Sequence, residues 1–158
     1  PWRVLVTRPD MQAMEWIQQK TPDDSLFLVE GYHYQGYSAT GSDAGWWIPL
    51  LAGRPNNMPP QYALLSEVPV EPGYSRAVVD LVVQLGTVSP GTPEGSRLLC
   101  DWGFTHIYIG QQQGTVGHEA TRLFSDQDLA DSPAFSQAYR QDRVSIYTMN
   151  PKVCRSMP

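Results

Sequence analysis

Apolar residues recur at helical spacing in three stretches of the chain, and each stretch carries signals for a helix start or stop. A threonine, a proline and an acid at 7–10 open the first helix, which a Thr-Pro-Asp-Asp sequence at 21–24 ends. A second amphipathic helix is predicted from about residue 73 to 86, and a third between Thr92 and Gly103. Their buried faces would consist of Ala13, Met14 and Ile17, of Val78, Leu81 and Leu85, and of Leu98, Leu99 and Trp102.

Short apolar runs bounded by turn residues predict the strands. The segments 26–29 and 104–109 suit buried strands, 144–149 alternates, and 62–66 is a further candidate. Residues 31–43 are expected to form a long loop. A capping box at Ser125 to Asp128 predicts a short helix, and a helical turn is expected to restart at Ser132-Pro133 and to carry Phe135, Ala138 and Tyr139.

Strands that are separated by helices indicate a layered α/β domain, with a small, mostly parallel sheet flanked by helices. The last strand, 144–149, is the candidate for an antiparallel edge strand. The length of 158 residues suits one domain, which we assign to residues 1–150, with a loose tail at 151–158.

The densest aromatic cluster is the segment 42–54, where two adjacent tryptophans stand between Asp43 and Arg54 after a loop rich in tyrosine. We expect this segment to be a short helix. Aromatic rings stack on the C–H faces of sugars, and a carboxylate and a guanidinium form hydrogen bonds with polar groups. The segment is therefore a candidate surface for binding a glycan or a peptide. The alternative is structural, with core tryptophans, a cap at Asp43 and a helix end at Arg54. Neighbouring helix residues cannot both face the core, so one indole should be exposed. The candidate binding residues are Tyr32, His33, Tyr34, Tyr37, Asp43, Trp46, Trp47 and Arg54.

Composition and charge narrow the function classes. A net charge of −5 argues against a nucleic-acid partner, whose binding needs clustered Lys and Arg. No apolar run approaches the roughly 18 residues of a membrane span, and the start at Pro1 suggests part of a longer polypeptide. We expect no metal and no cofactor. The burial of Cys100 in a helix favours free thiols, and a disulfide with Cys154 is the alternative for an extracytoplasmic domain.

No complete catalytic set is present among the histidines and serines. His118 and Glu119 are a second candidate site for acid–base or metal chemistry, although no second pair of ligands accompanies them. His106 lies between apolar strand residues, which favours a hydrogen-bonded core histidine over a catalytic base. The segment 110–114 lacks the Lys-Ser/Thr of a phosphate-binding loop, so a plain turn is expected there.

Several short sequence blocks together carry a resemblance. They are Ala-Met-Glu-Trp-Ile at 13–17, Ser-Asp-Ala-Gly-Trp-Trp-Ile-Pro-Leu at 42–50, Ala-Gly-Arg at 52–54, Thr-His-Ile-Tyr-Ile-Gly at 105–110 and Asp-Ser-Pro-Ala-Phe at 131–135. With these blocks the chain resembles the C-terminal extracytoplasmic domain of bacterial multi-spanning membrane proteins of the glycosyltransferase type. The residues from Asp43 to Ile48 also show a distant likeness to the Trp-Trp-Asp-Tyr-Gly signature of oligosaccharyltransferase catalytic subunits, but Gly41-Ser42 and Ala44 replace its tryptophans and tyrosine.

The resemblance implies a non-catalytic extracytoplasmic domain that contributes glycan or acceptor-peptide contact or scaffolding, beside the membrane portion of the same polypeptide. The alternative is a freestanding small α/β enzyme with its pocket at the C-terminal ends of the strands. In that case Glu30-Gly31, the loop after Ile109 and the pair His118-Glu119 should converge on one cleft.

Overall fold

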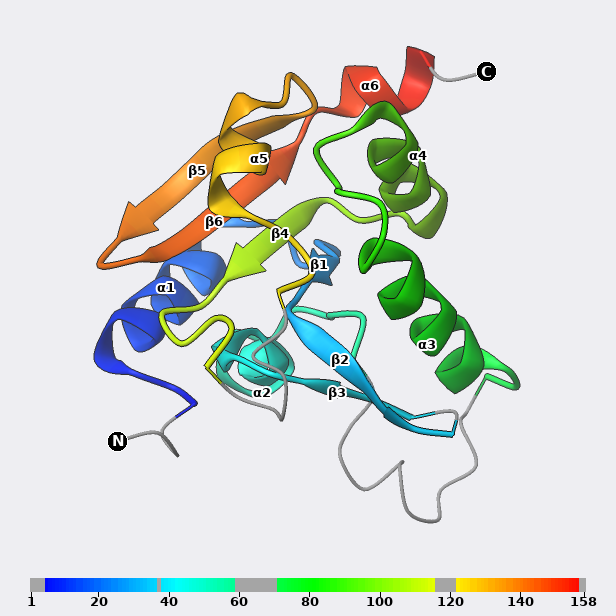
Figure 1. The fold of residues 1–158 in the computed structure, drawn as a ribbon. Coiled ribbons are helices and arrows are strands. Elements are labelled where there is room, and N and C mark those ends of the chain that lie inside the picture. The colour runs from blue at the N-terminus through cyan, green and yellow to red at the C-terminus, as the bar shows by residue number, and fades with distance from the viewer. Residues whose placement is uncertain (1–4, 37, 59–70, 116–121, 157–158) are drawn as a thin grey trace.

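A computed structural model of the protein shows helices packed around a four-stranded sheet, with a separate two-stranded hairpin (Figure 1). The α/β class that the sequence predicts is confirmed. Within the part of the chain that the structure describes, no helix has the length and apolar character needed to cross a bilayer. The described residues are 5–36, 38–58, 71–115 and 122–156.

The main sheet has the strand order β1-β4-β6-β5. Its strands are β1 (Phe27–Leu28), β4 (His106–Ile109), β6 (Val144–Met149) and β5 (Phe135–Gln141). Only β1 and β4 pair in parallel, and the β4–β6 and β6–β5 pairings are antiparallel. The expectation of a mostly parallel sheet is therefore wrong. The last strand is antiparallel as expected, but it lies inside the sheet, and β5 forms the edge.

Helices cover both faces of the central strands. Helix α1 (Arg8–Lys20) lies on the face that carries Tyr108 and Tyr139, where the Trp16 and Tyr139 rings are 5.5 Å apart. Helix α5 (Asp126–Asp131) lies on the other face, where Tyr147 donates its hydroxyl to an Asp126 carboxylate oxygen over 2.8 Å. Because both faces are covered, β4 is buried along its whole length and β6 along nearly all of it.

The predicted long loop at 31–43 is instead largely a hairpin of β2 (Gly31–Gln35) and β3 (Ser38–Gly41). Helix α3 (Tyr74–Leu85) packs against both of its strands. The predicted helix at 42–54 is confirmed as a 3₁₀ turn, η1 (Ala44–Trp47), followed by α2 (Ile48–Leu51).

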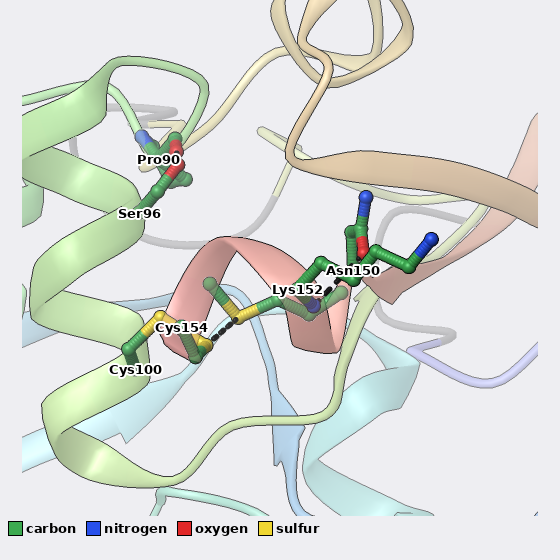
Figure 2. The surroundings of a disulfide bond; sticks show 7 residues. Pro90, Ser96, Cys100, Asn150, Lys152 and Cys154 are labelled. Carbon is green, nitrogen blue, oxygen red and sulfur yellow. Dashed lines mark hydrogen bonds between the residues drawn. A yellow bond between two sulfur atoms is a disulfide. The ribbon is translucent and has the colours of Figure 1, made fainter. Parts of the chain in front are cut away.

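The C-terminal third contains two further departures from the predictions. The helical turn expected after Ser132 is the edge strand β5, and the tail expected to be loose forms α6 (Pro151–Ser156). A disulfide joins Cys154 on α6 to Cys100 on α4 (Pro93–Trp102), so the prediction of free thiols is wrong (Figure 2). The strand predicted at 62–66 lies outside the described residues.

Candidate functional site

The two adjacent tryptophans have different environments, as their spacing predicts. Trp46 is partly buried and packs against the core, and a Cβ atom at Gly41 of β3 would lie 2.5 Å from its side chain. Trp47 is 41% exposed, and Leu50, one helical turn further on, is 74% exposed. We refer to residues 46–51 as the tryptophan turn. With the exposed Pro49 between them, Trp47 and Leu50 present an apolar surface that includes one aromatic ring.

The hairpin supplies the tyrosines of the candidate surface. Tyr32 is partly exposed and Tyr34 is 56% exposed. The exposed His33 ring has its Nε2 atom 2.8 Å from the Gly36 carbonyl oxygen, which fixes the ring across the hairpin turn. Tyr37 lies outside the described residues. The structure therefore leaves Tyr34 as the most exposed aromatic side chain of the described hairpin.

Arg54 does not belong to this surface, because its side chain is buried and serves as a helix cap. Its guanidinium donates hydrogen bonds to the carbonyl oxygens of Gln18 (3.1 Å) and Thr21 (2.9 Å) at the end of α1, and to that of Ala52 (3.3 Å) after α2. It also forms an ion pair with Asp23 at 2.9 Å. The guanidinium group thus donates hydrogen bonds to carbonyl oxygens that have no hydrogen-bond donor within their own helices. The binding role expected for Arg54 is replaced by a structural one.

Asp43 is also structural, as the alternative interpretation holds. Its carboxylate is fully buried and accepts hydrogen bonds from the backbone N–H groups of Gly45, at the start of η1, and Gly110, just after β4, both over 2.8 Å. A Cβ atom at Gly110 would lie 2.9 Å from Asp43 Oδ2. Asp43 therefore caps η1 and fastens it to the end of the central strand.

Two further buried carboxylates lie near Asp43 and hold the same region of the chain. Asp10 accepts the N–H of Gln111 over 3.0 Å. Glu30 accepts the N–H of Leu123 over 2.7 Å and the side-chain amide of Gln113 over 2.8 Å. The three carboxylates thus bind groups on both described flanks of the segment between β4 and α5. From the sequence, Asp43 was predicted to be a binding residue, and Glu30 was considered only for the alternative of a small enzyme. Asp10 was predicted to be part of the start of the first helix.

Burial dominates the electrostatics of these groups. It raises the pKa of Glu30 to about 7, an effect that hydrogen bonds from Gln113 and Leu123 oppose. Burial, together with the negative charges of Glu30 and Asp10, raises the pKa of Asp43 to about 8, and the hydrogen bonds from Gly110 and Gly45 oppose this rise. Taking a carboxylate out of water favours its protonated form, and a neighbouring negative charge does the same.

One of the contacts expected for a small enzyme is present in the structure. Glu30 and the loop after Ile109 do contact each other, through Gln113, at the C-terminal ends of the parallel strands β1 and β4. Both Glu30 and Asp43 are fully buried, however, and both oxygens of each accept hydrogen bonds from the protein. His118 and Glu119 lie outside the described residues.

His106 is a core histidine, as predicted. It stacks on Phe27 with ring centroids 4.7 Å apart, and its Nδ1 atom lies 2.8 Å from the Thr105 hydroxyl oxygen. Burial lowers its pKa to about 4, so the ring is neutral at neutral pH. Among the described residues, no group of three or more His, Cys, Asp or Glu side chains is arranged to hold a metal ion.

Comparisons of the chain with protein-family models, with curated proteins and with solved structures found no match.

Proposed function

We propose that this protein is an extracytoplasmic binding domain, part of a membrane protein of the glycosyltransferase type, that contacts a glycan or an acceptor peptide through the tryptophan turn. The observation that carries the proposal is the exposure of Trp47 and Leu50, together with Pro49, on a turn whose Ile48 side chain is buried in the core. An indole fixed at the surface offers a flat apolar face to sugar C–H groups or to a peptide side chain.

The Cys100–Cys154 disulfide supports an extracytoplasmic setting. Disulfides form and persist in oxidising compartments such as the bacterial periplasm, and they are rare in the cytosol. The location and the membrane-bound remainder of the polypeptide are parts of the proposal and rest on this bond and on the sequence resemblance.

The test compares Trp47→Ala with Val83→Ala by NMR titration with oligosaccharides and with acceptor-type peptides. Val83 is the matched control, because it is 55% exposed but lies on α3, outside the tryptophan turn. We expect the Trp47→Ala protein to fold normally and to bind at least about tenfold more weakly, as is typical of an aromatic residue that dominates an interface. Equal binding by both variants would remove the tryptophan turn from the proposal.

A small enzyme is the second candidate, favoured by the contact of Glu30 with the loop after β4. Its test is NMR titration with small acyl, phosphoryl and glycosyl compounds. Shifts centred on the amides of Gly110, Gln111 and Leu123 would favour the enzyme, whereas shifts centred on the tryptophan turn would favour the binding domain.

A further inference from the structure

The start of the tryptophan turn is held in place by one buried carboxyl group. Asp43 accepts the N–H of Gly45 through one oxygen and the N–H of Gly110 through the other, both over 2.8 Å. Gly45 lies in η1, whose last residues begin the tryptophan turn, and Gly110 directly follows β4. The same carboxyl group therefore shapes the turn and attaches it to the central sheet.

A second side chain holds the same part of the turn and does not titrate. The Asn56 amide donates a hydrogen bond to the Gly45 carbonyl oxygen over 2.9 Å and to that of Trp46 over 3.3 Å. The turn is thus fixed by one group whose charge depends on pH and by one group whose charge does not. Experiments can separate the contributions of these two groups.

The surroundings of Asp43 disfavour its negative charge. Its side chain is fully buried, and neither ion pair found among the described residues includes it. Asp10 of α1 and Glu30 of the chain after β1 are buried as well, and their charges act on Asp43. Tyr108 of β4, on which the Asp43 charge also acts, stays protonated, and the cation of Arg122 acts on Glu30. Burial without a cationic partner penalises a carboxylate, so the protonated form is favoured while Asp43 stays buried.

Opening of this contact would release a proton. Burial raises the pKa of Asp43 from its ordinary value of 3.8 to about 8. Between these pH values the closed state holds a proton that an opened, solvated carboxyl group loses, so each added pH unit multiplies the open fraction by up to about ten. The part that can move is the turn, because β4 is paired on both sides, with β1 and β6. Trp47 and Leu50 of the turn are already 41% and 74% exposed.

We propose that protonation of Asp43 regulates the tryptophan turn, which the protonated carboxyl group holds on β4 and which ionisation of that group releases locally. As a regulation of binding this rests on the proposed function, whereas the proton linkage is a property of the protein without its ligand. A ligand that needs the closed turn would bind more weakly as the open fraction grows, and its binding would in turn favour proton uptake.

Amide hydrogen exchange, measured by NMR from pH 5 to pH 8, tests the proton linkage. After correction for the intrinsic pH dependence of exchange, the protection of the Gly45 and Gly110 amides should fall by up to about tenfold per pH unit. The matched control is the Gly95 amide, which donates to Thr92 Oγ1 over 3.1 Å at the start of α4, in a cap that does not titrate. Constant protection of Gly45 and Gly110, or a change equal to that of Gly95, would overturn the proposal.

Low concentrations of urea separate local release of the turn from global unfolding. A local opening exposes little surface, so exchange of the Gly45 amide should respond weakly to urea, whereas exchange in the buried strand β6 follows global unfolding. A urea dependence of Gly45 equal to that of β6 would assign the pH effect to global unfolding and would also overturn the proposal.

Two variants identify the titrating group. Asn56→Ala removes the hydrogen bonds that do not depend on pH, so the protection of Gly45 should fall at every pH and keep its wild-type slope. Asp43→Asn should abolish that slope, and a retained slope would contradict the assignment to Asp43. The wild-type exchange profile needs no variant, so the test stays decisive if Asp43→Asn does not fold.

The same measurement separates this inference from the proposed function. Any oligosaccharide or peptide that binds at Trp47 should raise the protection of Gly45 at pH 8. A pH-dependent protection of Gly45 without binding of those probes would support the proton linkage and contradict the proposed function. Binding at Trp47 with a protection that is constant between pH 5 and pH 8 would support the proposed function and overturn the linkage.

Discussion

The hydroxyl of Tyr108 donates a hydrogen bond to Asp10 Oδ1 over 2.8 Å, across 98 positions of the sequence. The other carboxylate oxygen accepts from the N–H and the hydroxyl of Thr7, at 2.8 and 2.6 Å. One buried carboxylate therefore caps α1 and also joins that helix to the central strand. Burial and the negative charge of Asp10 raise the pKa of Tyr108 well above its ordinary value, which keeps the phenol protonated as the donor.

Removing the Tyr108 hydroxyl should destabilise the protein, although the substitution deletes only one oxygen atom and leaves no large cavity. Tyr108→Phe leaves a buried carboxylate short of one hydrogen bond, so we expect a loss of about 1–3 kcal/mol in the free energy of unfolding. Urea denaturation measures it. Tyr34→Phe, on the exposed hairpin, is the control, and its stability should equal that of the wild type. An unchanged midpoint for Tyr108→Phe would show that the contact contributes nothing.

The protein should be more stable in mild acid than in mild alkali. The pKa values of Glu30 and Asp43 are about 7 and 8 in the folded protein, above their ordinary values of 4.5 and 3.8. At these two groups the folded state therefore holds protons that the unfolded chain releases, and their contribution to stability declines as the pH rises from about 4 to about 8. His106, whose pKa is lowered to about 4, opposes this decline below about pH 6.5, so the net loss of stability is steepest between about pH 6.5 and 8. Glu30 alone should account for about 2–3 kcal/mol between about pH 5 and pH 8, measured by urea denaturation at each pH.

Glu30→Gln tests the assignment of that pH dependence. The variant loses the titrating carboxyl, so its slope of stability against pH should be smaller than that of the wild type. Glu15→Gln, on an exposed position of α1, should keep the wild-type slope. A wild-type slope in the Glu30→Gln protein would assign the pH dependence to other groups.

Reduction of the disulfide should cost much of the stability. The bond joins residues 54 positions apart and holds α6 against α4. By the loop-entropy relation, a loop of this length contributes about 4 kcal/mol, and measured effects are often smaller. Cys154→Ala should lower the denaturation midpoint, and dithiothreitol should lower that of the wild type but not that of the variant. A wild-type midpoint that dithiothreitol leaves unchanged would contradict this expectation.

Gly110 should not accept a side chain. A Cβ atom there would meet the buried Asp43 carboxylate at 2.9 Å, so Gly110→Ala should cost about 1–3 kcal/mol through overpacking. Gly86→Ala is the control, because its nearest neighbour would be a carbonyl oxygen at 3.3 Å and its φ is −66°. Comparable thermal midpoints for the two variants would show that the Asp43 loop shifts easily.

The two tryptophans should differ sharply in their effect on stability. Trp46→Ala removes a side chain that packs on the core and on Gly41, and we expect a loss of roughly 3 kcal/mol. Trp47→Ala should change stability by less than about 0.5–1 kcal/mol, because much of its ring is exposed. Guanidinium denaturation compares them. Unfolding of both variants would make the tryptophan turn part of the core.

The helices were predictable because their start and stop signals are local. Thr92 accepts the N–H of Gly95 at the start of α4, and Gly103, with φ 78°, ends it. The hairpin at 31–41 was missed because its exposed tyrosines and glycines show no alternation of apolar and polar residues. At 135–139, Phe135, Ala138 and Tyr139 match helical spacing, yet β5 has few buried residues to create a strand pattern.

The candidate site was predictable only in part. Adjacent tryptophans on one helical turn imply that one of them is exposed, and Trp47 is. The buried roles of Asp10 and Arg54 depend on partners that lie 98 and 36 residues away, at Tyr108 and Gln18. No local pattern contains such information. The most useful sequence signal for these buried carboxylates is an acidic residue directly after a predicted buried strand, as Glu30 is.

The register of β5 against β6 shifts between Gln137 and Tyr139, so the outer strand of the sheet is irregular at its middle. A foreign strand that tried to extend the sheet would meet unevenly spaced backbone groups and the charged Arg140 side chain, which is paired with Asp126 at 2.9 Å. Such an edge is a poor template for strand-to-strand growth. Pairing of this edge with a strand of a second copy is therefore less favourable than it would be along a regular edge strand.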